Sequence, residues 1–440
     1  MPVGTSHLHT AALKRELGRW DLTAIGVNQV IGGAVFALPA ALFATAGAWS
    51  PWMVAAVGVA SMLIALSFAE VASRFDGTGG SYLYTRVAFG RFASFEVGWM
   101  MWFTRAASWA SVINVLAASL GFYWPILTSG AMRAVFFTTI IAIVAAINIR
   151  GIRQSSFVVN VFTMGKLLPL AVFVAAGLFF VDWSALGRPA PVSLHDLSTS
   201  GLLLVFAFGG YEVIPVPAGE AKDPRRAVPF ALIMTILIVT LVMTLAQVVA
   251  IGTLPSLAAS KTPLADAAAL FLGAGGAFMI TLGAVFSTSG NNMGQALSGS
   301  RNLYALAEQG DLPPFFGRVH ERFRTPINAI LVTSIVALLL AVSGTFQTMA
   351  AASAISRLLV YVATCASVIR LRQSRFAHEV KPASFVVPFG PVIPALAIVF
   401  ALAILAGATK TQLVVGTGAL AAGAVLYVIA IRGSEGAEGG

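Results

Sequence analysis

Twelve long apolar stretches dominate this sequence of 440 residues and limit what the chain can fold into. A helix needs about 20 apolar residues to cross a bilayer, and each stretch is long enough for one crossing. Hydrophobic residues make up 58% of the chain and charged residues 10%, which is too apolar for a soluble protein of this size. The sequence therefore predicts an all-α polytopic membrane protein with about twelve transmembrane helices. The expected spans are residues 21–45, 50–73, 91–123, 132–149, 156–181, 199–219, 228–252, 275–303, 326–343, 348–370, 386–407 and 410–431.

The distribution of basic residues predicts how these helices are oriented. With the N-terminus in the cytoplasm, the cytoplasmic segments hold twenty Lys and Arg residues, the outer segments hold four, and three lie within spans. This bias satisfies the positive-inside rule, so both termini should be cytoplasmic, with tails at 1–20 and 432–440. The loops then account for the net charge of +10, and no nucleic-acid partner is expected. Residues 1–20 are polar and lack the apolar centre of a signal peptide.

The composition also argues against several kinds of chemistry. Cys365 is the only cysteine, so neither a disulfide framework nor a thiolate metal site is expected. The five His residues lie in tails or loops without metal-ligand spacing, and the sequence has no Gly-x-x-x-x-Gly-Lys loop that could bind ATP phosphates. We therefore expect no cofactor, no metal and no enzyme activity.

Two of the predicted spans are interrupted by paired glycines. Gly32 and Gly33 lie in the middle of the first span, and Gly209 and Gly210 lie in the sixth, shortly before Glu212. A glycine in a helix interior costs about 1 kcal/mol, and a membrane tolerates the backbone groups that a break frees only where they line a cavity. Breaks at matching places in two halves indicate the central site of a transporter, whereas close helix packing at small residues is the alternative. The separation of five spans predicts these units: a first inverted repeat at 21–181, a second at 199–371, and a peripheral pair of helices at 386–431.

Several motifs resemble those of the amino acid–polyamine–organocation (APC) superfamily. Residues 31–36 (IGGAVF) resemble the small-residue signature of its first span, and residues 206–212 (FAFGGYE) with 218–229 (AGEAKDPRRAVP) resemble its sixth span and cytoplasmic exit. Further agreement comes, in the same order along the chain, from residues 79–84 (GGSYLY), 300–305 (SRNLYA) and 310–313 (GDLP). The resemblance implies a LeuT-like fold with a 5+5 inverted repeat, interrupted helices 1 and 6, and amino-acid transport. Ala34 and Val35 stand where the family usually has Gly and Ile, so the resemblance leaves the substrate side chain open.

The backbone groups at these breaks suit the two charges that every α-amino acid carries. Free N–H groups at the start of a half-helix suit a carboxylate, and free carbonyls at the end of one suit an ammonium. The expected N–H donors are in span 1: Gly32, Gly33 and Ala34. The expected carbonyl acceptors are Phe206, Ala207 and Gly209, with Val30 or Ile31 assisting. Phe208 and Gly210 complete the candidate substrate-binding residues, and the resemblance gives Phe206 the position of an aromatic outer gate.

Lys166 in span 5 is the most informative charge inside the membrane, where an ionisable residue is costly. Residues 166–169 (KLLP) resemble a lysine–proline element of proton-coupled APC members, in which the ammonium occupies the place of the ion of sodium-coupled relatives. A buried lysine can release and regain a proton, which predicts a role in coupling. The alternative is a permanently charged lysine that braces spans 1 and 8. Either Ser287 or Ser289 of span 8 should face Lys166, and we favour Ser287 as part of the coupling site.

Three further charges lie in or near the predicted core. Glu212 is interpreted either as a proton-sensitive part of the coupling site or as an acid paired with an arginine. Arg105 and Arg357 could pair with Glu212 or read an acidic substrate side chain. Trp109 lies one turn from Arg105 and could form a wall of the side-chain pocket. Two acids near cytoplasmic helix ends are expected to pair with loop arginines: Glu70 and Glu96.

These observations predict a secondary active transporter, a permease that carries amino acids by proton-coupled symport. Its partners would be the amino acid, protons and the lipid bilayer. Arg outnumbers Lys by 21 to 6, which is typical of a GC-rich bacterial genome. Together with the apolar spans, this predicts a multi-pass protein of the bacterial inner membrane. Three alternatives remain: an amino-acid exchanger with Lys166 as a fixed charge, a polyamine or amine transporter, and a receptor-like or channel protein with the same fold.

Overall fold

The structure is a computed structural model, and it describes residues 17–75, 80–150, 156–187, 191–215, 221–323 and 325–438. Most of the predicted N-terminal tail lies outside the described residues. In the described ranges the chain is helical, apart from short turns, loops and one isolated bridge between Leu17 and Ala221. The helices are α1 (Arg19–Val30), α2 (Ala34–Ala46), α3 (Ser50–Ala72), α4 (Ser81–Phe89), α5 (Arg91–Gly121), α6 (Gly130–Ile149), α7 (Ser156–Gly177), α8 (Leu194–Phe208), α9 (Pro224–Thr253), α10 (Pro263–Glu308), α11 (Pro314–Gly317), α12 (Ile327–Ser343), α13 (Phe346–Leu371), α14 (Val392–Ala406) and α15 (Lys410–Glu438).

Six helical segments of the described chain are long and apolar enough to cross a membrane. They are Ala34–Ala72, Gly130–Ile149, Pro224–Thr253, Pro263–Glu308, Phe346–Leu371 and Lys410–Ala430, and three shorter apolar helices accompany them: Phe162–Gly177, Ile327–Ser343 and Val392–Ala406. A helical membrane protein, as the sequence predicts, is the architecture that these segments support. Many large apolar side chains remain exposed on the outer helix faces, where only lipid could cover them.

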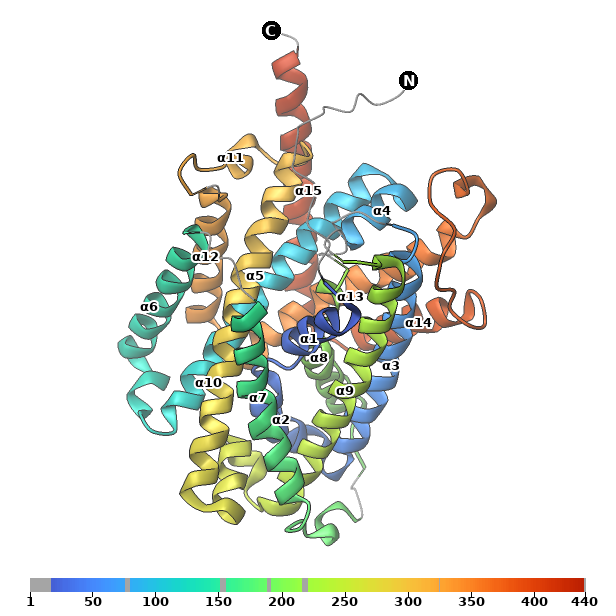
Figure 1. The fold of residues 1–440 in the computed structure, drawn as a ribbon. Helices are drawn as coiled ribbons and strands as arrows, with labels where there is room; N and C mark the ends of the chain where they lie inside the picture. The colour runs from blue at the N-terminus through green and yellow to red at the C-terminus, as the bar shows by residue number, and fades with distance from the viewer. Residues whose placement is uncertain are drawn as a thin grey trace.

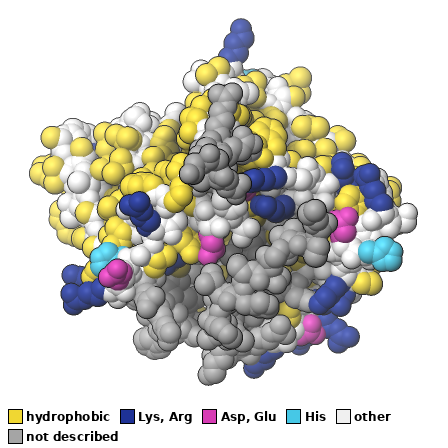
Figure 2. Space-filling view, turned by 90° about the horizontal axis from the view of Figure 1, so that it is seen from above, with side chains coloured by type: hydrophobic (Ala, Val, Ile, Leu, Met, Phe, Trp, Pro, Cys, Tyr) yellow, Lys and Arg dark blue, Asp and Glu magenta, His cyan; other side chains and the backbone are white. Residues whose placement is uncertain are grey.

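The helices form a bundle in which the breaks lie near the centre (Figure 1). α1 and α3 pack on α9, while α5 runs through the bundle and packs on α10, α12 and α13. α4, α11 and the C-terminal end of α15 lie at one end of the molecule, at the top of Figure 1. Lys and Arg side chains gather on that face, as Figure 2 shows.

Some parts of the predicted layout differ from the structure. α14 begins at Val392, six residues after the predicted start of the eleventh span, because Pro388 and Pro391 flank a turn with positive φ angles at Phe389 and Gly390. Between the predicted spans 50–73 and 91–123 the chain forms a further helix, α4. α15 continues helical to Glu438, where we expected a tail from residue 432.

α10 is one helix in hydrogen bonding but has a kink at Gly273, where the backbone angles are φ 67° and ψ −163°. Only glycine adopts this conformation without strain, so the residue sets the change of direction. The kink separates the short segment from Pro263 onward from the long apolar part that crosses the bundle (Figure 1).

Candidate functional site

The first break separates α1 from α2. α1 ends at Val30 and α2 begins at Ala34, so Ile31, Gly32 and Gly33 are not helical. The Gly32 N–H donates to the Val30 carbonyl at 2.8 Å, which uses one of the donors expected for a carboxylate. The first N–H groups of α2 have no partner within that helix and lie at its positive end. The donors that remain for an anion are therefore those around Gly33 and Ala34.

The second break follows α8, which ends at Phe208. Gly210 has φ 132°, a conformation that other residues rarely adopt, and a short turn of helix, η4 (Tyr211–Val213), follows it. A Cβ atom on Gly210 would lie 2.8 Å from the backbone oxygen of Gln29 at the end of α1. The two breaks therefore touch, and glycine is required for both the turn and the close approach.

Lys166 reaches from α7 into the first break. Its side chain is fully buried, and Nζ donates hydrogen bonds to the carbonyl oxygens of Asn28 at 2.8 Å and Ile31 at 2.9 Å. From α10, the Ser287 hydroxyl donates to the carbonyl oxygens of Ile31 and Gly32, both at 3.1 Å. Of the two serines considered from the sequence, Ser287 makes this contact. A cation thus satisfies the carbonyls at the C-terminal, negative end of α1.

Glu212 joins three parts of the bundle beside the second break. Its Oε1 accepts hydrogen bonds from Arg105 Nη2 of α5 at 3.0 Å and from Arg357 Nη1 of α13 at 2.6 Å. Its Oε2 accepts from the Gly210 N–H at 2.8 Å and from the Tyr361 hydroxyl at 3.1 Å. Four donors favour the ionised carboxylate. This geometry supports the paired acid, rather than the proton-sensitive residue, of the two interpretations drawn from the sequence.

A small cavity lies between the two breaks. Its volume is about 20 Å³, which has room for about one water molecule, so in this conformation it cannot hold an amino acid. The lining residues are Gln29, Val30, Gly32, Gly33, Ala34, Ser108, Val112, Phe206, Gly209, Asn291, Gln295 and Arg357. Four expected substrate-binding residues are buried near the breaks without lining this cavity: Ile31, Ala207, Phe208 and Gly210.

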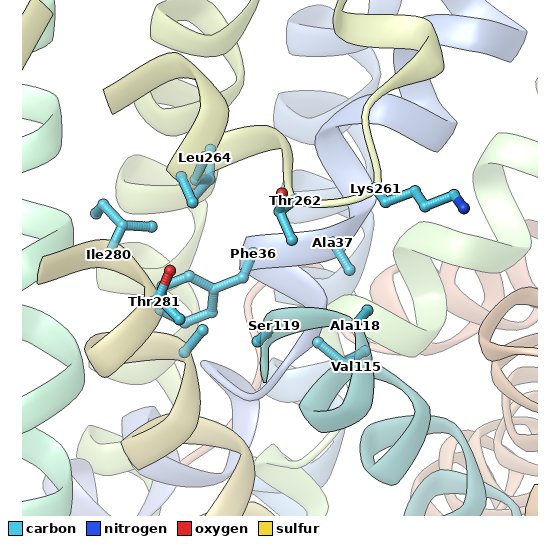
Figure 3. A pocket seen from close by; sticks show the side chains of 12 residues that line it. Phe36, Ala37, Val115, Ala118, Ser119, Lys261, Thr262, Leu264, Ile280 and Thr281 are labelled. Atoms are coloured by element: carbon cyan, nitrogen blue, oxygen red, sulfur yellow. The ribbon is translucent and has the colours of Figure 1, made fainter. Parts of the chain in front are cut away.

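A much larger vestibule of about 1150 Å³ is lined by residues of α2, the C-terminal end of α5, the start of α6 and residues 256–266. These segments lie at the other end of the bundle from α4 and α11 (Figure 1). Phe346 at the start of α13 lines the vestibule, and Phe206 lines the central cavity. Their rings meet edge to face, with centroids 5.9 Å apart, so this aromatic pair lies between the two spaces. Figure 3 shows a side pocket that shares several lining residues with the vestibule. In this side pocket the Phe36 ring lies beside Thr281.

The chain is similar to known proteins over most of its length. The family model described as "Amino acid permease" matches residues 17–431. The chain belongs to the amino acid permease family. Similar proteins of Bacillus subtilis (strain 168) include the methylthioribose transporter (28% identity, covering 87% of this chain and 86% of the relative), the branched-chain amino acid permease BcaP (27%, 89% and 87%) and the serine/threonine exchanger SteT (27%, 89% and 90%).

Membership of this permease family supports amino-acid transport and points to a transporter rather than an enzyme. It also confirms the resemblance to the APC superfamily that the motifs indicated. Together with the apolar helices, it indicates a multi-pass protein of the bacterial cell membrane.

The end of the permease opposite the vestibule is held by ion pairs. Glu70 of α3 accepts hydrogen bonds from Arg372 Nε at 2.7 Å and Arg74 Nη2 at 3.3 Å, as the sequence predicts. Asp311, fully buried after α10, accepts from Arg91 Nε at 2.6 Å and from the Tyr82 hydroxyl at 2.8 Å. Burial and the hydrogen bond to Asp311 raise the pKa of Tyr82 to about 12, so this hydroxyl stays a donor at neutral pH.

Two other residues lie away from the places predicted for them. Both carboxyl oxygens of Glu96 are buried and have no hydrogen-bond partner in the described ranges, so the expected pairing with a loop arginine is wrong there. Glu96 turns toward α15, where a Cβ on Gly423 would lie 2.9 Å from its Oε2. Trp109 does not line the central cavity, because it packs in an apolar cluster with Phe137 of α6 and Ala337 of α12.

Most of the polar residues that line the cavity were not among those predicted from the sequence. Gln29 precedes the first break, and Asn291 and Gln295 lie one turn apart on α10. Asn291 donates to the Gln29 carbonyl at 3.0 Å, and Gln295 donates to the Asn291 side chain at 3.2 Å. The available signal was the spacing of four residues between these two amides, which puts them on the same face of the helix.

Proposed function

We propose that this permease is a secondary active transporter that binds α-amino acids between its two broken helices and moves them by alternating access. The observation that carries the proposal is the contact of the two breaks beside a cavity. There the N-terminal turn of α2 offers N–H groups to a carboxylate, and carbonyls at the end of α8 offer acceptors to an ammonium. Backbone groups would thus read the part that all amino acids share.

We further propose a LeuT-like fold of twelve spans. The spans would be α1 with α2, then α3, α5, α6 and α7 in the first repeat; α8 with η4, then α9, α10, α12 and α13 in the second; and α14 and α15 at the periphery. One parallel between the halves supports this division. The fifth span of each half sends a cation to the break of its own first span: Lys166 to the Ile31 carbonyl, and Arg357 to a position against Gly209. Both termini would be cytoplasmic, and the basic face of Figure 2 would be the cytoplasmic face.

Coupling to protons would act through Lys166, with Ser287 completing the coupling site. The ammonium ties α7 to α1 through two carbonyl oxygens, and Ser287 ties α10 to the same break. A neutral amine at Lys166 would bind these carbonyls more weakly, so release of the proton would loosen α1 at the break. Glu212 would remain an ionised counter-charge to Arg105 and Arg357 throughout.

Phe206 would act as the gate between the vestibule and the site. Its ring lines the central cavity and meets Phe346 on the vestibule side. An amino acid that arrives from the vestibule would pass this pair, because the two rings lie between the two spaces. The cavity of about 20 Å³ would then have to widen to hold it. Movement of Phe206 away from Phe346 would admit the substrate.

Uptake into proteoliposomes tests the proposal. Purified protein would be offered a panel of labelled amino acids, with and without an inward proton gradient, and compared with Lys166→Met and with Lys410→Met, an exposed control at the start of α15. We expect gradient-stimulated uptake by the wild type and by Lys410→Met, and loss of the stimulation in Lys166→Met. Uptake that requires preloaded amino acid and ignores the gradient would contradict symport and favour exchange. No uptake of any amino acid would contradict the proposed function itself.

A further inference from the structure

The central cavity adjoins a buried cluster that holds more positive than negative charge. Arg105, Arg357 and Glu212 are each at most 3% exposed, and Glu212 contacts both guanidinium groups through one oxygen. Within the described ranges, no second carboxylate forms an ion pair with either arginine. The cluster therefore carries one positive charge in excess. Because a buried charge without a counter-charge is costly, a bound anion would stabilise this part of the protein.

Arg357 is the arginine that lines the cavity. Its Nη1 donates to Glu212 at 2.6 Å, and its Nη2 donates to the Ser108 hydroxyl at 3.3 Å. Its Nε is buried and has no hydrogen-bond partner in the part of the chain that the structure describes. A buried N–H without an acceptor is unfavourable, so an acceptor supplied by a ligand beside Arg357 would stabilise this group.

The position of Arg357 depends on Gly209 at the second break. A Cβ atom on Gly209 would lie 1.8 Å from Nη1 and 2.1 Å from Cζ of Arg357, so no side chain can be added there without displacing the guanidinium. The arginine is thus seated directly against the broken backbone. The same small cavity is lined by Gly33 and Ala34, whose N–H groups suit an α-carboxylate. If the α-carboxylate lies at Gly33 and Ala34, a second group on the ligand that accepts a hydrogen bond from Arg357 would have to be close to the α-carbon.

We infer that this site selects an α-amino acid whose short side chain ends in a carboxylate, and that Arg357 binds this second carboxylate. The inference rests on the proposed function, because it assumes that the shared part of an amino acid lies at the breaks. The side-chain carboxylate would accept a hydrogen bond from Nε and would supply the negative charge that the Arg105–Glu212–Arg357 cluster lacks. Glu212 holds the guanidinium in place from the other side.

Competition binding to the purified protein tests this selectivity. The probes are L-aspartate and L-glutamate, their neutral isosteres L-asparagine and L-glutamine, and L-leucine. We expect the wild type to bind a dicarboxylic amino acid about tenfold or more tightly than its amide, since hydrogen bonds to charged groups are worth this much. Arg357→Gln should bring the ratio close to one, and Arg357→Lys should lower it in part, because lysine keeps the charge but has no Nε–H in the guanidinium plane.

The matched control is Arg226→Gln, whose side chain is 87% exposed on α9 and should keep the wild-type ratio. The ratio of the affinities for a dicarboxylic amino acid and its amide does not depend on how much of the protein is folded. The ratio measured for the wild type tests the selectivity even if the Arg357 variants fail to fold. Equal or tighter binding of the neutral amino acids by the wild type would overturn this inference and leave the proposed function standing. An unchanged ratio in Arg357→Gln would overturn the assignment to Arg357. Binding of none of the probes would overturn the proposed function as well.

Discussion

Glu212→Gln isolates the part that one negative charge plays in the centre of this permease. The substitution keeps the shape of the side chain and removes its charge. In the wild type, Oε1 lies 2.6 Å from Arg357 Nη1 and 3.0 Å from Arg105 Nη2, and all three side chains are buried. The variant leaves two buried guanidinium groups without a counter-charge. Removal of one partner from such a buried pair costs about 3–5 kcal/mol.

A loss of this size is a large share of the free energy of unfolding of a typical protein, which is about 5–15 kcal/mol. The assay is denaturant unfolding of the detergent-purified protein, followed by tryptophan fluorescence. Glu308→Gln is the control, because Glu308 lies at the exposed end of α10 and accepts a hydrogen bond from Tyr304 of the same helix. The free energy of unfolding of that variant should lie within about 0.5 kcal/mol of the wild-type value, as for most surface substitutions.

A second variant tests the reason for the effect. Arg105→Met, Glu212→Leu and Arg357→Met together remove all three charges and fill the space with apolar atoms. We expect this triple variant to recover most of the lost stability, because apolar replacement of a whole buried ion cluster is often neutral or stabilising. Two results would refute the electrostatic explanation. One is a free energy of unfolding of Glu212→Gln within about 1 kcal/mol of the wild-type value, and the other is a triple variant less stable than Glu212→Gln.

Two further variants test the substrate path. Gly33→Leu should abolish amino-acid binding in an equilibrium binding assay, because even a Cβ there would lie 3.0 Å from Val115 and Thr288 and the larger side chain would fill the cavity; normal affinity would contradict the placement of the carboxylate. Phe206→Ala should speed the release of bound substrate by about tenfold or more, since it removes the ring that meets Phe346; wild-type release rates would exclude a gating role.

The breaks could be predicted from the sequence because their cause is local. Paired glycines weaken a helix wherever they occur, and the helices do end at Val30 and Phe208. The contact of Lys166 with the first break was also accessible, since a lysine in an apolar span needs carbonyl or acidic partners. Pairing of Glu212 with Arg105 and Arg357 was among the expected possibilities and is what the structure has.

The sequence could not predict which side chains of α5 lie on the cavity side of the helix. This helix is packed by α10, α12 and α13, so its faces are buried on several sides and hydrophobic periodicity does not separate the cavity side from the rest. Arg105 and Trp109 are four residues apart, yet Arg105 contacts Glu212 while Trp109 packs toward Phe137. Ser108 lines the cavity and was not singled out.

The direct contact between Gly209 and Arg357 also constrains how this protein can evolve. Replacement of Arg357 by a smaller residue while Gly209 stays removes the ion pair with Glu212 but creates no steric clash. Any larger residue at position 209 meets the guanidinium first, since its Cβ would lie 1.8 Å from Nη1. The order of mutations is therefore fixed: position 357 must change before position 209. Among related sequences, an arginine at position 357 should occur only together with a glycine at position 209. Sequences with glycine at position 209 should have many different residues at position 357.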